Sequence, residues 1–209
     1  MHLQRSALAV VLAPLAVVLA PLALAGAAGA TQASCVPAAA TTLRSAGAAR
    51  IYSEGSVLYG CLGARQTRLG PLRGTLPSPA TRIVLYALSS GYAGVDTLDM
   101  GTDTASSTVS LVSLRTGATI ATAPATTPEL RAESFATVTS MAVNAAGTLA
   151  WIGERGAIGV TTPTFEVHAL NAARSRLLAS SATIAPKSIG LRGRKLSWRD
   201  GGNTRSATL

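Results

Sequence analysis

The sequence contains few of the residues from which catalytic and metal sites are built. Among its 209 residues are only 2 His and 2 Cys, and 13% of the residues are charged. No Gly-x-Ser-x-Gly motif occurs, which argues against a serine hydrolase of the common α/β type. We find no glycine-rich cofactor loop and no cluster of metal ligands, so we expect no cofactor. The low charge, combined with a hydrophobic content of 48%, excludes a long disordered chain.

The N-terminal residues have the pattern of an export signal. Arg5 is followed by an uncharged run from Ser6 to Ala30 that is filled with Leu, Val and Ala. This pattern is typical of a signal peptide, so we predict a signal peptide over residues 1–30 and a single domain over residues 31–209, in a protein that is secreted or held at the cell surface. The alternative is an uncleaved anchor of a membrane-tethered structural protein, because a helix of ~20 apolar residues can span a bilayer.

Two cysteines, Cys35 and Cys61, remain after the export segment. An exported protein meets an oxidising environment, so we expect the two to form one disulfide bond. Their spacing is unlike the Cys-x-x-Cys arrangement of a redox-active pair. The sequence therefore predicts a structural disulfide.

Basic residues outnumber acidic ones by 18 to 9, for a formal net charge of +9. Such a balance attracts anionic partners. We do not expect nucleic acid, because the Arg residues are dispersed and no aromatic stacking motif accompanies them. An anionic cell-wall polymer, a membrane surface or another protein is a candidate partner, and a solvated basic face without a partner is the favoured alternative.

The basic residues are most concentrated near the C-terminus, around a Gly-Gly-Asn segment that predicts a hairpin turn over residues 201–203. Such a concentration can bind an anionic polymer, or it can protect a sheet edge from aggregation. The candidate binding residues are Arg192, Arg194, Lys195 and Arg199.

Beyond residue 40 the hydrophobic pattern is that of strands. Short alternating runs are separated by clusters of Gly, Ser, Thr, Asn and Pro every 8 to 12 residues, which is typical of an antiparallel all-β fold. The one predicted helical turn covers Thr127 to Glu133. The predicted strands cover residues 49–52, 56–61, 66–69, 82–88, 108–114, 119–122, 138–143, 148–153, 164–170, 175–179, 188–192, 195–199 and 203–208.

Two segments of the chain resemble each other. Residues 86–94 and 151–159 align an aromatic residue and two glycines at a constant offset of 65. Further along, residues 109–117 align with 165–173 at an offset of 56, so the first copy has nine extra residues, which we assign to a loop over 95–107.

Partial copies over residues 55–60 and 193–198 flank this pair. A unit of about 45 residues with four strands that cannot bury its own faces is typical of a propeller blade. Trp151 and Trp198, which end apolar strands at the same position of the repeat, are predicted to pack between blades.

The segment from Asn144 to Ile152 resembles the turn and inner strand of WD40-like repeats, in which a tight turn ending in Gly precedes the strand. On these residues the chain resembles exported actinobacterial proteins of unknown function with degenerate β-propeller repeats. The resemblance implies a partial or small propeller of about four small sheets, and a β-sandwich is the alternative. An open sheet edge in such a fold would favour a homo-oligomer.

Carboxylates gather in the predicted loop, where Asp96, Asp99 and Asp103 follow one another closely. Paired carboxylates can hydrolyse glycosidic bonds, so a carbohydrate-active enzyme that uses these residues is an alternative function. Their spacing fits no known calcium loop, which makes Ca²⁺ a weak candidate ligand. We expect His168 to lie beside Glu166 on the exposed face of a strand. The function best supported by the sequence is therefore a secreted, non-catalytic β-repeat protein for binding or scaffolding at the cell surface.

Overall fold

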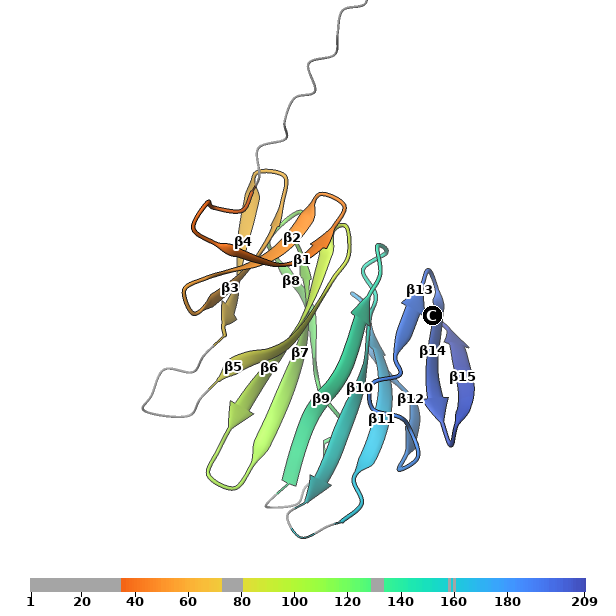
Figure 1. Cartoon of the computed structure of the whole chain (residues 1–209). Helices are drawn as coiled ribbons and strands as arrows, with labels where there is room; N and C mark the ends of the chain where they lie inside the picture. Colours follow the sequence, from red (N-terminus) through yellow and green to blue (C-terminus); the bar gives the residue numbers. More distant parts are fainter. Residues whose placement is uncertain (1–34, 73–80, 129–133, 158, 160) are drawn as a thin grey trace, which may run out of the picture. The chain divides into compact units, whose positions relative to one another are not determined.

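A computed structural model describes residues 35–72, 81–128, 134–157, 159 and 161–209 (Figure 1). These residues belong to one compact unit, Gln32–Leu209. The expected signal peptide, and with it the alternative membrane anchor, lies outside the described residues, and so does most of the expected helical turn, Thr127 to Glu133. No helix in the described ranges is long and apolar enough to cross a membrane.

The described chain is all-β and almost entirely antiparallel. Its strands are β1 (Thr41–Ala46), β2 (Ala49–Glu54), β3 (Val57–Leu62), β4 (Arg65–Pro71), β5 (Arg82–Leu88), β6 (Tyr92–Met100), β7 (Ala105–Ser113), β8 (Thr119–Pro124), β9 (Ser134–Val143), β10 (Leu149–Ala157), β11 (Thr164–Leu170), β12 (Ser175–Ser181), β13 (Gly190–Arg192), β14 (Lys195–Asp200) and β15 (Asn203–Thr208).

Each strand pairs with the next along the chain in four successive antiparallel meanders. The first is β1–β4, the second β5–β8, the third β9–β12 and the last β13–β15. The second and third meanders are joined into one eight-stranded sheet by a short parallel pairing between β7 and β9. In Figure 1 the meanders follow the colour order from orange to blue.

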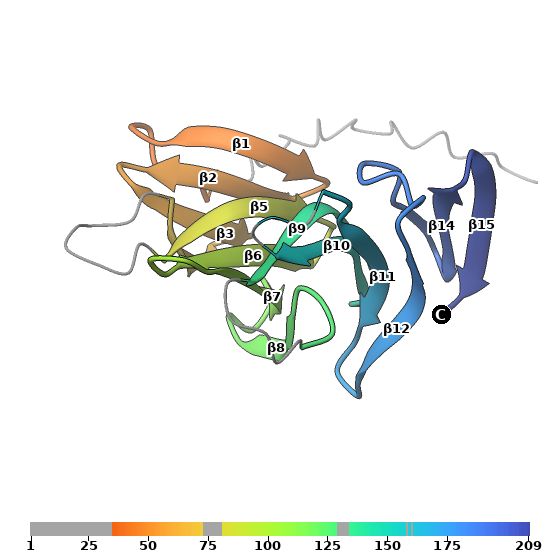
Figure 2. The same cartoon turned by 90° about the horizontal axis from the view of Figure 1, so that it is seen from below.

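Figure 2 shows the meanders following one another in chain order. A hydrophobic cluster fills the space between each meander and the next. Between the first and second meanders lie Ala49, Ile51, Leu58, Ile83, Ala93, Val95 and Leu114. Between the second and third lie Val109, Leu111, Ala123, Leu149, Trp151 and Leu170. Between the third and last lie Ala150, Ile152, Val167, Ile184, Leu196 and Trp198. The middle meanders are therefore buried on both faces, and the two Trp residues are core residues as predicted.

The outer face of the first meander is covered by the segment that precedes it. The predicted disulfide is present between Cys35 and Cys61, and these two cysteines pack with Tyr52, while Val36 and Tyr59 pack against the cluster. Closing such a loop stabilises a fold by ~3 kcal/mol in the chain-entropy estimate. The disulfide thus attaches a cover to one end of the stack of meanders.

The last meander contains the predicted hairpin turn. Gly201 and Gly202 connect β14 to β15 and have φ values of 56° and 82°. A two-residue hairpin loop of type I′ needs positive φ at both positions, which glycine adopts without steric cost.

The predicted strands are confirmed with small shifts at their ends, but two strands were not predicted, β1 and β6. The expected loop over 95–107 is wrong, because these residues form most of the β6–β7 hairpin. The described strands form three hydrogen-bonded sheets, one of them with eight strands, where about four small sheets were expected, and these sheets do not close into a propeller ring.

The offset of 65 also needs correction, because it aligns β5 with β10, the first strand of one meander with the second strand of the next. The offset of 56 aligns β7 with β11, each the third strand of its meander. The offset of 56 is therefore the one that aligns strands with the same position in the second and third meanders.

Candidate binding face and buried polar groups

The outward face of the last meander carries cations and hydroxyl groups. Leu196 and Trp198 of β14 point inward and belong to the core, so alternation turns Lys195, Ser197 and Arg199 to the outside. The residues directly paired with these three share their face. They are Gly190 and Arg192 on β13, and Thr204, Ser206 and Thr208 on β15. We call this surface the terminal face.

Two grooves lie on the terminal face. One, of about 580 Å³, is lined by Lys187 and Arg199. The other, of about 420 Å³, is lined by Arg192 and Lys195. Both grooves include Ser197 and Thr204 in their walls, so they adjoin each other on β14 and β15, and we call the pair of grooves the trough.

One wall of the trough is a loop that precedes β13 and is fixed to the rest of the protein. The carbonyl oxygen of Pro186 accepts hydrogen bonds from the hydroxyls of Thr139 and Ser140 on β9, both at 2.7 Å. The Ser188 hydroxyl donates to the Ala185 carbonyl at 2.7 Å, and the Arg199 N–H donates to the Ser188 hydroxyl at 2.9 Å. Lys187 is therefore held beside Arg199 before any ligand binds.

The electrostatic character of this end of the chain is strongly positive. Residues 187–209 contain six cations and one acid, Asp200. The Asp200 carboxylate accepts a hydrogen bond from Thr183. Among the described residues, no carboxylate lies within ion-pair distance of the four cations of the trough. An anionic ligand would therefore meet cations whose charge is not already neutralised.

The structure brings together three of the four basic residues that were candidates. Arg192, Lys195 and Arg199 share the terminal face. Arg194 lies in the β13–β14 turn, and its Nε donates to the Leu209 carbonyl oxygen. Lys187 was not among the candidates, and only the long-range hydrogen bonds of its loop place it at the trough.

The three predicted acidic residues do not converge on one site. Asp96 lies in the middle of β6 and is fully buried. Asp99, near the exposed end of the same strand, accepts a hydrogen bond from Thr81 at 3.2 Å, and an odd spacing of three residues puts it on the face opposite Asp96. Asp103 is exposed in the β6–β7 turn.

The side chain of Asp96 lies between the second and third meanders. Gly94, on the same face of β6, lies against Leu149 of β10. Neither carboxyl oxygen of Asp96 makes a well-formed hydrogen bond within the described part of the chain. Burial raises the pKa of Asp96 from 3.8 to about 7, and the nearby Ser107 hydroxyl opposes this shift only in part.

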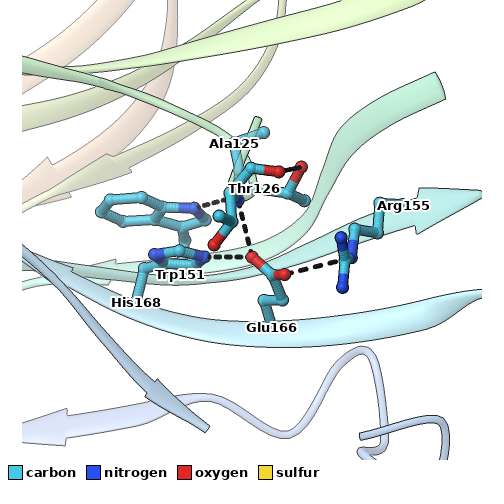
Figure 3. A network of polar contacts seen from close by, with 7 residues as sticks. Ala125, Thr126, Trp151, Arg155, Glu166 and His168 are labelled. Atoms are coloured by element: carbon cyan, nitrogen blue, oxygen red, sulfur yellow. Dashed lines mark hydrogen bonds and ion pairs between the residues drawn. The ribbon is translucent and has the colours of Figure 1, made fainter. Parts of the chain in front are cut away.

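A second buried polar group, shown in Figure 3, is formed by Glu166 and His168 of β11. His168 Nε2–H donates to Glu166 Oε2 at 2.8 Å, and the Thr127 N–H donates to the same oxygen at 2.7 Å. Arg155 of β10 lies 3.1 Å from Glu166 Oε1. The His168 ring stacks on Trp151, with the ring centroids 5.0 Å apart.

The expected exposure of His168 and Glu166 is wrong, since they are 5% and 1% exposed. They are neighbours on one face of the strand, as expected, but that face packs against the segment after β8. This segment is fixed further by the Trp151 indole, whose N–H donates to the Ala125 carbonyl at 2.7 Å. Gly153 lies so close to the segment that a Cβ there would overlap the same carbonyl oxygen.

The pKa values of this pair indicate a fixed ion-pair network. Burial alone would raise the pKa of Glu166, but the hydrogen bonds from Thr127 and His168 outweigh it, so the pKa is lowered. Burial lowers the pKa of His168, and Glu166 opposes that shift only in part. A neutral His and a charged Glu thus anchor the Ala125–Thr127 segment of the second meander to the third meander.

Comparison with known proteins does not extend these observations: no protein-family model matches the sequence, and no curated protein matches it.

Proposed function

We propose that the protein is a secreted, non-catalytic β-repeat protein that binds an anionic polymer at the cell surface through its terminal face. The observation that supports this most is the trough on that face, which is lined by four cations that have no acidic partner among the described residues. Anionic cell-wall polymer is the partner whose charge is complementary to such a surface. The disulfide between Cys35 and Cys61 is compatible with an extracellular location.

We also propose that the fold is related to propeller repeats. The resemblance to degenerate β-propeller repeats implies successive antiparallel meanders that pack face against face, and the meanders of this chain pack in that way. In such a stack the end sheets need a polar or covered outer face to stay soluble. The first meander has a disulfide-linked cover, and the last has the charged terminal face, which is open to a ligand.

Co-sedimentation with cell walls of the host that exports the protein tests the proposal. We expect the purified exported protein to be retained at physiological salt, and the triple variant R192E/K195E/R199E to bind at least tenfold more weakly. The control is R68E/R174E/R176E, which changes the net charge equally at three exposed positions elsewhere. Equal loss in the two variants would contradict a specific face, because it would show only that net charge governs retention.

A further inference from the structure

The cations of the trough lie at its two ends. Arg192 and Lys195 are paired across β13 and β14 at one end. At the other end Arg199 lies next to the loop that carries Lys187. Lys195 and Arg199 are four residues apart on one strand, which separates their backbones by roughly 13 Å.

Between these ends the trough is lined by hydroxyl groups instead of charges. Ser197 is shared by both grooves, and its hydroxyl donates only a long bond of 3.4 Å to the Gly190 carbonyl. On β15, Ser206 is paired with Ser197 in the middle, and Thr204 is paired with Arg199 at one end. Both residues are exposed, and within the described ranges their hydroxyls make no hydrogen bond. The middle of the trough thus offers hydroxyls that can both donate and accept.

Building on the proposed function, we propose that the ligand is a polymer in which anionic groups alternate with hydroxyl-bearing units, as in a polyol phosphate, and not a uniformly charged polyanion. Two anionic groups of one chain would bind the two cationic ends. The polyol unit between them would exchange hydrogen bonds with Ser197 and Ser206, and with Thr204 beside Arg199. In a polyphosphate no polyol separates the charged groups, so an anion would lie against Ser197 and Ser206, away from the cations at the two ends.

Two probes with the same number of phosphate groups, poly(glycerol phosphate) and inorganic polyphosphate, test this inference. Binding of each to the purified exported protein is measured by titration calorimetry at physiological salt. We expect poly(glycerol phosphate) to bind at least tenfold more tightly. The variant S197A/T204A/S206A should lose most of that preference, because each lost hydrogen bond weakens binding about fivefold, while it leaves polyphosphate binding unchanged. The control T41A/T42A/S45A removes three exposed hydroxyls from β1 and should bind as the wild type does.

The outcomes separate this inference from the proposed function. Equal or tighter binding of polyphosphate, or an unchanged preference in S197A/T204A/S206A, overturns the alternating ligand and leaves the anion-binding face standing. Failure of both probes to bind, or binding that R192E/K195E/R199E does not weaken, overturns the proposed function itself. Far-ultraviolet circular dichroism of each variant verifies that the strands are retained.

Discussion

Replacing Asp96 by asparagine should stabilise the protein at pH 8 and leave its stability nearly unchanged at pH 4. Asp96 is fully buried between the second and third meanders, and its carboxyl oxygens make no well-formed hydrogen bond within the described residues. Ionisation therefore places an unpaired charge in an apolar environment, which is costly. Asparagine has a similar shape and stays neutral at every pH.

The sign of the effect follows from proton linkage. The pKa of Asp96 is about 7 in the folded state, against 3.8 for the free side chain. Between these values the folded state retains a proton that the unfolded state has lost, so the stability contributed by Asp96 falls as pH rises from about 4 to 7. With about 1.4 kcal/mol for each pKa unit, the loss is on the order of 4 kcal/mol.

Chemical denaturation of both proteins between pH 4 and pH 8 measures this effect. The difference between the two free energies of unfolding isolates Asp96, because His168 and Glu166 titrate in both proteins. The matched control, D103N, removes an exposed carboxylate from the same hairpin and should follow the wild-type profile. A difference that stays constant across this pH range would show that Asp96 has the same pKa in the folded and unfolded states, which would contradict the raised pKa.

Replacing Glu166 by alanine should lower the free energy of unfolding at pH 7 by ~3 to 5 kcal/mol. The substitution removes a buried carboxylate that accepts hydrogen bonds from Thr127 and His168 and pairs with Arg155. Removal of one member of a buried ion pair costs ~3 to 5 kcal/mol, because the remaining members are left buried and unpaired.

The isosteric variant E166Q is the control for this prediction. Its amide oxygen can still accept from Thr127 or His168, but it does not attract Arg155 by charge, so we expect an intermediate loss. Urea denaturation at pH 7 gives both values. A loss below about 1 kcal/mol for E166A would contradict an anchoring role of the network, since that is the range of surface substitutions.

Asp96 and Glu166 both lie between the second and third meanders, whose strands β7 and β9 share only two residue pairs. Ionisation of Asp96 weakens the contact between these meanders, and Glu166 strengthens it. The ionisation of Asp96 therefore makes the contact between these two meanders sensitive to pH.

Alternating hydrophobicity predicted most strands but placed two buried side chains on the surface. A strand with alternating residues is normally solvated on one face, and on that basis Glu166 and His168 were expected to be exposed. In the middle meanders both faces pack against neighbours, so Val167 belongs to one cluster and Leu170 to another. These polar residues are buried because one meander packs on the next, and a local sequence pattern does not encode that packing.

The β6 strand was missed for a related reason. Its sequence contains Gly94 and two aspartates, residues that are depleted in strands and enriched in turns. Tertiary context overrides these preferences, because Gly94 is where Leu149 packs against the strand.

The terminal face was only partly predictable. The clustering of Arg192, Lys195 and Arg199 is visible in the sequence because they lie on one hairpin. The position of Lys187 depends on hydrogen bonds from Thr139 and Ser140, which lie more than 40 residues earlier in the chain. Long-range anchoring of this kind leaves no signal in a single sequence.

Amide hydrogen–deuterium exchange of the exported protein, with and without poly(glycerol phosphate) at physiological salt, tests the central claim most directly. We expect poly(glycerol phosphate) to slow exchange in the loop around Lys187 and in β13 to β15, and to leave exchange in β1 to β4 unchanged. Slower exchange confined to other meanders, with the C-terminal strands unaffected, would contradict the assignment of the binding site to the terminal face.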